Sequence, residues 1–144
     1  MSLFQILDAS GTGLAAQTVR LNVTASNLAN ADSVSSSLDQ TYRARHPVFG
    51  TVEMDDPARF SNHLDAVRNL GVRVDGIVAS QAPLPAEYRP DHPQANAEGY
   101  IFHTNVNVVE EMANMLSATR TYQSNLEVMN AVKQMLLRTI TLGQ

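Results

Sequence analysis

The fold is decided by residues 107–143, NVVEEMANMLSATRTYQSNLEVMNAVKQMLLRTITLG, a stretch without proline. From Val108, alternating steps of four and three residues pick out one row: Val108, Met112, Met115, Thr119, Tyr122, Leu126, Met129, Lys133, Leu136 and Ile140. Eight of these ten residues are apolar or aromatic. The row covers about five heptads, more than the ~12 residues of an average helix. Asn107 followed by Glu110 fits a helix N-cap. The pattern therefore predicts a long C-terminal helix that packs as a coiled-coil arm.

A second helix is predicted at the other end of the chain, from Leu3 to about Ala31. Leucines recur there at intervals of seven, the period of a supercoiled seam, as Leu7, Leu14, Leu21 and Leu28. The intervening positions of this row, Gly11, Thr18 and Ala25, are small and allow a close approach of helix axes. The opposite face has almost no charge, although a solvated helix usually carries charged pairs there. The pattern indicates a helix that contacts protein on several sides.

Between the helices we expect a small β-rich module. Candidate strands, rich in branched and aromatic residues, are Thr41–Arg45, Val48–Val52, Gly71–Val78 and Tyr100–His103. A short helix is expected around residues 59–68, and prolines favour an extended chain over residues 81–99. The predicted fold class is α+β, with the terminal helices forming a coiled-coil-like paired arm. The expected segments are an N-terminal helical arm (1–34), a β-rich central module (35–104) and a C-terminal helical arm (105–144).

Charge is scarce and unevenly placed. Only 24 of the 144 residues (17%) are charged, and residues 32–111 hold 18 of them, whereas an average domain carries about 25%. The net charge of −4 leaves no basic footprint for nucleic acid. Cysteine is absent, which excludes disulfides and thiol catalysis. Apolar runs fall short of the roughly 18 residues of a membrane span, and the positive start of a secretory signal is missing before Arg20. The charge-poor ends coincide with the predicted helices, which indicates helices buried against other chains.

No motif in the chain points to catalysis. Gly11-Thr12-Gly13 with Ala16 and Asp32 formally matches a dinucleotide fingerprint, but it lies in a helical pattern instead of after a strand. The four histidines show no metal-site spacing; they are His46, His63, His92 and His103. We expect no catalytic, cofactor-binding or metal residues and no cofactor. The alternative is a small metal-dependent enzyme that uses these histidines with Asp55, Asp56 and Asp91.

Several motifs, in order along the chain, resemble one protein family. Residues 21–32, LNVTASNLANAD, are similar to the SNLAN signature of the bacterial flagellar rod and hook proteins. The similarity continues through Tyr42–Arg45, Val48-Phe49, Tyr88–Pro93, Ala97–Ile101, Asn105–Asn107, Val109–Met112, Ala118–Asn125 and Thr139–Leu142. One departure is Thr104, where the family usually has proline. The short length and residues 80–83, SQAP, favour a proximal rod protein, with a different short rod protein of the family as the alternative.

The resemblance implies a structural, non-enzymatic subunit of the flagellar basal-body rod, located in the periplasm. Such a subunit polymerises through its terminal helices, connects motor and hook, and transmits torque. The implied partners are copies of the chain, other rod proteins and the flagellar type III export apparatus. Export of this kind uses no cleaved signal peptide. Neither nucleic-acid binding nor membrane insertion is expected.

We expect the assembly interface on both helices. Its N-terminal part comprises Leu7, Leu14, Leu21, Ser26, Asn27, Leu28 and Asn30, and its C-terminal part Met112, Met115, Tyr122, Leu126, Met129, Leu136 and Ile140. The amides of Asn27 and Asn30 are expected to bond neighbouring backbones, where buried charge would be costly. An export signal is expected in the apolar cluster Leu3, Phe4, Ile6 and Leu7.

Overall fold

The computed structural model describes residues 3–53 and 70–142, and it confirms the α+β fold. Helix α1 spans Leu3–Ala29 and helix α2 spans Val108–Leu142. The strands between them are β1 (Val34–Ser35), β2 (Arg45–Glu53), β3 (Leu70–Ala79), β4 (Ala86–Tyr88) and β5 (Tyr100–His103). The helix expected around residues 59–68 lies outside the described residues.

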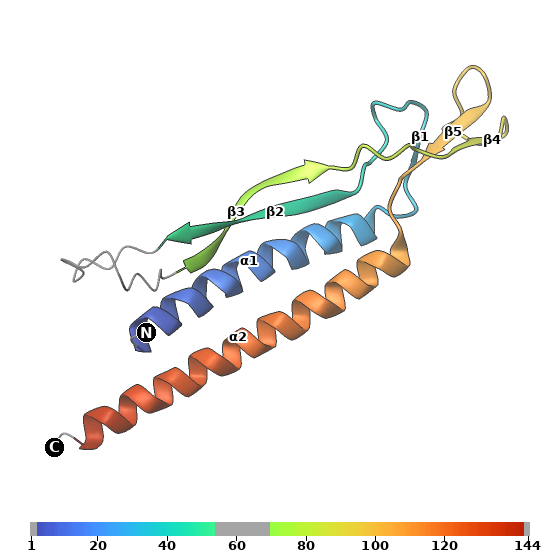
Figure 1. The fold of residues 1–144 in the computed structure, drawn as a ribbon. Coiled ribbons are helices and arrows are strands. Elements are labelled where there is room, and N and C mark those ends of the chain that lie inside the picture. Colours follow the sequence, from blue (N-terminus) through green and yellow to red (C-terminus); the bar gives the residue numbers. More distant parts are fainter. Residues whose placement is uncertain (1–2, 54–69, 143–144) are drawn as a thin grey trace.

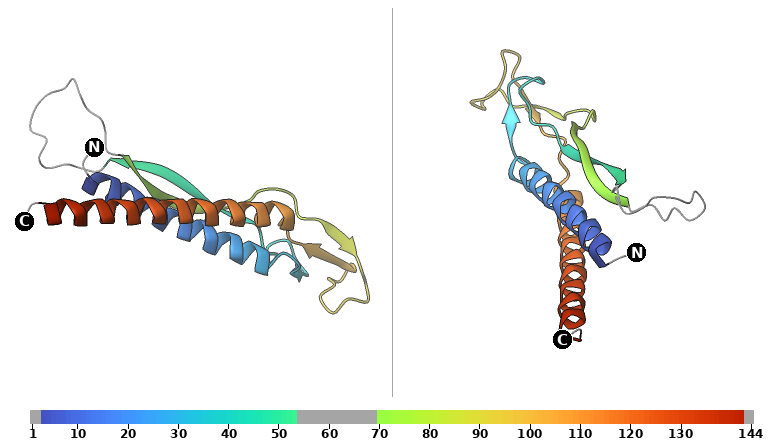
Figure 2. Two further views of the ribbon diagram at one scale, coloured as in Figure 1. Left: turned by 90° about the horizontal axis from the view of Figure 1, so that it is seen from below. Right: turned by 90° about the vertical axis from the view of Figure 1, so that its left-hand side faces the viewer.

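The molecule is elongated, and α1 is its middle layer (Figure 1). The β2–β3 pair covers one side of α1, and α2 runs antiparallel along another side. The small sheet formed by β1, β5 and β4 lies at the end where α1 stops and α2 begins. At the opposite end, α2 extends beyond the start of α1 (Figures 1 and 2). The last turns of α2 therefore have no described helix beside them.

Local side chains define the inner ends of both helices. The Oδ1 of Asn107 accepts hydrogen bonds from the backbone N–H groups of Val109 at 3.1 Å and Glu110 at 3.4 Å, which confirms the expected N-cap of α2. Helix α1 ends at Ala29, slightly before the expected Ala31. There the Nδ2 of Asn30 donates to the Ser26 carbonyl at 2.8 Å, and the Asn30 backbone N–H donates to the same carbonyl at 3.2 Å.

Strands β2 and β3 pair antiparallel, from Arg45 opposite Ala79 to Glu53 opposite Leu70. The strands expected at 48–52 and 71–78 are confirmed, and both are longer than expected. The strand expected over Thr41–Arg45 is wrong except at Arg45. Just before β2, the backbone N–H of Ala44 bonds to the side-chain amide of Asn105 instead of a strand partner.

The small sheet has the order β1-β5-β4, with antiparallel neighbours. Strand β5 is where the sequence predicts it, whereas β4 lies in the proline-punctuated segment expected only to be extended. Across this sheet, Glu87 of β4 bonds His103 of β5 through its Oε2 at 2.8 Å. Its other oxygen accepts from the Arg89 Nε at 2.8 Å. The contact with His103 ties β4 to β5 by side chains as well as by backbone.

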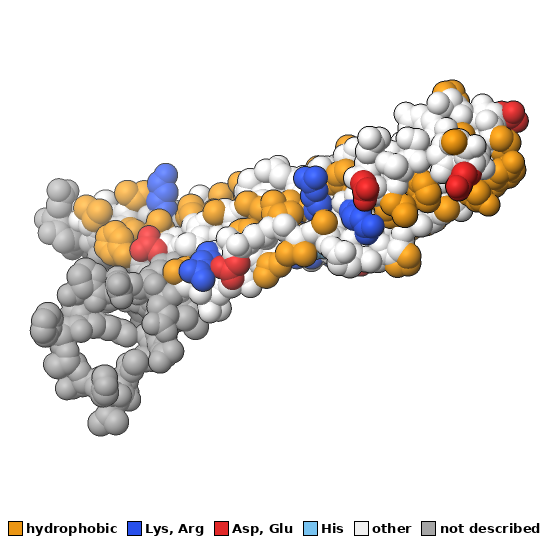
Figure 3. Space-filling model, turned by 90° about the horizontal axis from the view of Figure 1, so that it is seen from above, with side chains coloured by type: hydrophobic (Ala, Val, Ile, Leu, Met, Phe, Trp, Pro, Cys, Tyr) orange, Lys and Arg blue, Asp and Glu red, His pale blue; other side chains and the backbone are white. Residues whose placement is uncertain are grey.

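The interior of the chain is small. Among the described residues, the buried apolar ones are Ala16, Val23, Ala44, Ile101, Ala118 and Val132. Larger apolar residues are exposed on the helices, including Val109 (76%) and Ile140 (64%). Figure 3 shows hydrophobic side chains along the length of the molecule with few charged ones among them. Within the described residues, no helix has the length and hydropathy to cross a membrane.

Candidate assembly surface and its supporting junction

Helices α1 and α2 approach each other through small and polar side chains. A Cβ added at Gly13 would lie 2.8 Å from the Nδ2 of Asn125, so Asn125 fills the space that the glycine leaves. Further along α1, the Arg20 guanidinium donates to the Oδ1 of Asn114 at 3.0 Å. On α2 the most buried positions are Glu111, Ala118 and Val132, which are spaced in heptads with Asn125. This row marks the face of α2 that packs within the chain.

The buried row of α2 differs from the hydrophobic row expected from the sequence. Of the expected interface residues, Met115, Tyr122, Met129 and Leu136 are half-buried, whereas Met112, Leu126 and Ile140 are exposed. Hydrophobicity did not indicate the buried row because its members are Glu, Ala, Asn and Val. The exposed apolar residues are available for contacts outside the chain.

The leucine row of α1, Leu7, Leu14, Leu21 and Leu28, is half-buried along its whole length. Gly13 faces α2, and Thr12 faces β3, because its Oγ1 accepts the Val72 N–H at 3.2 Å. Successive residues of a helix are rotated by about 100°, so Leu14 lies on the side of α1 that faces neither β3 nor the centre of the α2 contact. Gly11, in the same row, has no atom within 4 Å of where its Cβ would be. The leucine row is thus only partly covered by its own chain.

Asn27 of the signature lies fully inside the chain, with 0% of its surface exposed. Its Oδ1 accepts from the Arg45 N–H at 2.9 Å and from the Tyr42 hydroxyl at 2.9 Å. Its Nδ2 donates to the Arg45 carbonyl at 2.8 Å. The amide therefore bonds both backbone polar groups of Arg45 and fastens the start of β2 to α1. A side chain enclosed in this way bonds its own chain and does not present its amide to a neighbour.

The other polar residues of the signature lie nearer the surface. Ser26 is exposed, and its Oγ lies 3.2 Å from the Tyr42 hydroxyl. Asn30 is half-buried and uses its amide on the Ser26 carbonyl, as described above. The polar side chains of the signature therefore make hydrogen bonds at the end of α1 and to the Tyr42 hydroxyl.

Two further residues bond the segments around Asn27 and Tyr42, and the sequence pattern assigned them no role. Asn105 accepts the Ala44 N–H at 2.8 Å through Oδ1 and donates to the Ala82 carbonyl at 3.0 Å through Nδ2. The hydroxyl of Thr104 donates to the Ala31 carbonyl at 3.0 Å. The only sequence signal was their place in the family-like motifs, with Thr104 as the departure. We call Asn27, Tyr42, Thr104 and Asn105 the junction, because together they join the end of α1 and the segment before α2 to the β-rich module.

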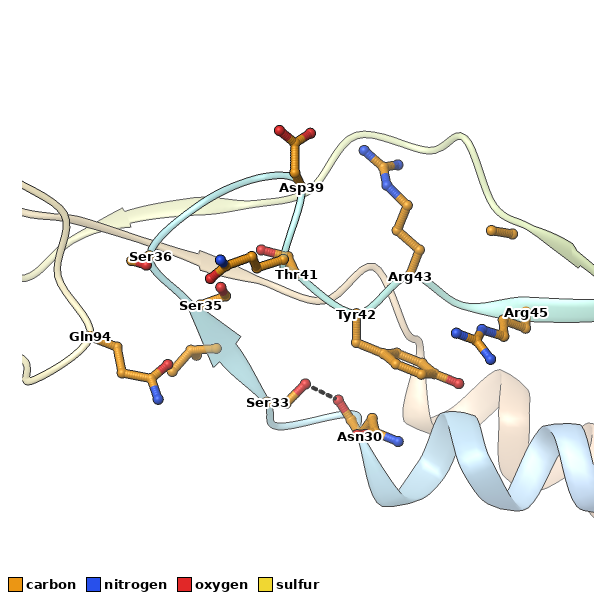
Figure 4. A pocket seen from close by; sticks show the side chains of 13 residues that line it. Asn30, Ser33, Ser35, Ser36, Asp39, Thr41, Tyr42, Arg43, Arg45 and Gln94 are labelled. Atoms are coloured by element: carbon orange, nitrogen blue, oxygen red, sulfur yellow. Dashed lines mark hydrogen bonds between the residues drawn. The ribbon is translucent and has the colours of Figure 1, made fainter.

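Beside the junction lies an open hollow of about 790 Å³, lined mainly by polar side chains (Figure 4). Among these, the Arg43 guanidinium already donates to the carbonyls of Ser80 and Ala82, both at 3.2 Å. Within the described residues, no group of three His, Cys, Asp or Glu side chains could hold a metal ion. Three residues of the metal-enzyme alternative, His63, Asp55 and Asp56, lie outside the described residues. The glycines of the formal dinucleotide fingerprint lie inside α1, not in a strand-to-helix turn.

The apolar cluster expected to serve as an export signal forms the first turns of α1. Phe4 is 68% exposed, while Leu3, Ile6 and Leu7 are half-buried. The cluster therefore presents its aromatic ring to the outside at one end of the molecule.

Comparisons with known proteins place similarity on both helices and on the whole chain. Residues 7–35 match the family described as flagella basal body rod protein, and residues 97–142 match the C-terminal region of the flagellar basal body rod FlgEFG proteins. The flagellar basal-body rod protein FlgC of Salmonella typhimurium (strain LT2) is 48% identical, with both chains covered in full. The FlgC proteins of Escherichia coli O157:H7 and Yersinia enterocolitica are 47% and 44% identical, again over 100% of both chains.

Proposed function

We propose, on the premise that this chain belongs to the FlgC family of flagellar basal-body rod proteins, that it joins its neighbours in the rod through α1 and α2. It is a structural subunit of the basal-body rod. In our proposal the polymerised helices connect motor and hook and transmit torque. A different short rod protein of the same family is not favoured by the full-length similarity to FlgC.

The exposed apolar surface of the two helices is the observation that carries this proposal. Met112, Leu126 and Ile140 project from α2, and the leucine row of α1 is half-covered. Such surface on a long helix is unfavourable in water unless another protein covers it. We keep the interface residues named from the sequence, except that Asn27 acts through the junction and not by direct contact. We also keep 1–34 and 105–144 as the assembly arms around module 35–104.

Further parts of the proposal rest on family membership. The partners are copies of this chain, other rod proteins and the flagellar type III export apparatus, and the site of action is the part of the basal body within the periplasm. The chain acts without enzymatic activity and without a cofactor, and it neither binds nucleic acid nor inserts into the membrane. Export proceeds without a cleaved signal peptide and uses the cluster Leu3, Phe4, Ile6 and Leu7.

Substitution in the leucine row tests the assembly proposal. Leu14→Asp or Leu21→Asp places a charge where an apolar neighbour is proposed, so rods fail to form in cells that carry only the variant. Swimming and electron microscopy of isolated basal bodies measure the effect, and circular dichroism of the purified variant checks its fold. Leu14→Met, which keeps the site apolar, is the matched control and retains rods. Normal rods from the aspartate variants would contradict the proposal.

The export proposal has its own test. Replacing Phe4 and Leu7 together with Ser removes the exposed ring and its neighbour on the helix, and secretion of the chain into the medium is expected to stop. Asp8→Asn, an exposed change on the same turn, leaves secretion unchanged. Undiminished secretion of the serine variant would rule out the cluster as the signal.

A further inference from the structure

We propose that the contact between α1 and α2 is a polar register lock, in which the Gly13–Asn125 and Arg20–Asn114 pairs fix one axial position of α2 along α1. Both pairs are contacts within a single chain. The lock can therefore be tested in the single chain, independently of the rod function proposed above.

Apolar contacts alone do not define this axial position. The leucines flanking the contact on α1 recur every seven residues, and so do the half-buried residues on α2, Met115, Tyr122, Met129 and Leu136. A slide of one heptad, about 10 Å along the axis, therefore brings similar apolar side chains opposite one another. Periodic apolar seams tolerate such slides, and a polar pair at one position is a known means of specifying register.

The two polar pairs remove this degeneracy. A slide of seven residues places Ala118 or Val132 opposite Gly13 in place of Asn125. The same slides place Asn107 or Thr121 opposite Arg20. The Asn107 Oδ1 already accepts two backbone N–H groups of α2, and the Thr121 hydroxyl donates to the Ser117 carbonyl. Only the observed register gives Gly13 an amide to fill its space and Arg20 a free carbonyl oxygen.

The neighbouring Gln17 shows that this seam is not optimised for stability. Gln17 lies between Gly13 and Arg20 on the same face of α1, and its Oε1 is buried without a hydrogen-bond partner among the described residues. An unpaired buried acceptor destabilises a contact. A seam that keeps polar groups despite this cost is typical of contacts that trade stability for specificity.

Distance measurement between spin labels tests the lock directly. The chain has no cysteine, so labels attach only at introduced sites. Asp8→Cys and Ser117→Cys are suitable, because both residues are exposed. Asp8 lies near the start of α1 and Ser117 near the start of α2, and the two helices run antiparallel (Figure 1). Pulsed electron paramagnetic resonance on the dilute full chain is expected to give one narrow distance. Adding Arg20→Leu with Asn114→Leu is expected to produce a second population, shifted by about 10 Å for a one-heptad slide. A single unchanged distance in that variant would overturn the lock, as would a broad distribution in the parent.

Three further variants keep the test decisive if the double leucine variant loses its helical structure. Gln17→Leu removes the unpaired acceptor but leaves both pairs, so the single distance persists while the melting temperature rises. Gly13→Asn crowds Asn125 and broadens the distance, whereas Gly13→Asn combined with Asn125→Gly exchanges the two partners and restores it. Failure of the exchange to restore the distance, or a new distance in Gln17→Leu, would count against the lock.

Discussion

Asn27 illustrates what one side chain contributes at the residue scale. Its amide replaces a strand neighbour for Arg45, since it accepts from the N–H and donates to the carbonyl of the same residue. The Tyr42 hydroxyl completes the set, and no part of the amide is exposed. The family signature drew attention to this position, but the role depends on Arg45, eighteen residues later in the chain. Sequence spacing alone did not predict that pairing.

We predict that Asn27→Ala destabilises the chain by about 1–3 kcal/mol, because it removes a buried amide and leaves the backbone N–H and carbonyl of Arg45 without these partners. The measurement is chemical denaturation followed by circular dichroism. Asn22→Ala, an exposed change on the same helix, serves as the control and shifts stability far less. Equal effects of the two substitutions would show that the junction contributes little.

Glu87 gives the molecule a pH-dependent contact at the end sheet. The hydrogen bond from His103 is the main cause that lowers the pKa of Glu87 below 4.5, and partial desolvation works against it while Arg89 adds to it. A carboxyl whose pKa is lower in the folded state stabilises the fold above its unfolded pKa and loses this effect as pH falls through the folded value. We therefore predict that the stability difference between wild type and Glu87→Gln shrinks as the solution is acidified below about pH 5. Denaturation series at several pH values measure it, with Glu98→Gln as an exposed-carboxyl control; a difference that grows on acidification would contradict the prediction.

At the scale of the helices and strands, local signals were sufficient for the helices. The start of α2 follows from Asn107, whose side chain bonds residues two and three positions away, and strand β5 follows from its own composition. Strand β4 was not predicted because three residues among prolines become a strand only by pairing with β5. The face of α2 that packs on α1 was not predicted either, because close approach to Gly13, and not hydrophobicity, selects Asn125.

The two glycines of α1 allow a prediction at the same scale. Gly11→Ala is expected to stabilise the isolated chain by about 0.5–1 kcal/mol, because alanine favours the helix and its Cβ meets no atom. Gly13→Ala gains less, since its Cβ would displace the Asn125 amide. Thermal unfolding of the two variants side by side measures the difference. A gain at Gly13 as large as at Gly11 would contradict the close approach at Gly13, and destabilisation by Gly11→Ala would contradict the open space at Gly11.

For the whole molecule, the scarcity of charge and the exposed apolar residues have one explanation. Charge is concentrated in residues 32–111, whereas the residues before and after this segment form most of α1 and α2. In the single chain these helices bury small and polar side chains between them and leave larger apolar ones outside. A monomer that functioned alone would be expected to show the reverse arrangement. The single chain therefore leaves much of its large apolar surface uncovered, which supports our proposal that neighbours in the rod cover its helices.

The end of α2 that extends beyond α1 is where this incompleteness should be measurable. Leu137 and Ile140 are 55% and 64% exposed there, and no described helix lies alongside. A few helical turns without packing are marginally stable in water, because helix stability in proteins comes mostly from tertiary contacts. We predict that backbone amides of residues 137–142 exchange rapidly with solvent in the dilute chain and become protected when the chain assembles. Hydrogen exchange with mass spectrometry, run beside light scattering, measures both states. Amides around Ala118 are the internal control, because that part of α2 packs against α1 in the single chain and should be protected throughout. Equal protection of residues 137–142 in the dilute and assembled chain would show that this end needs no neighbour, and would remove the overhang from the assembly surface.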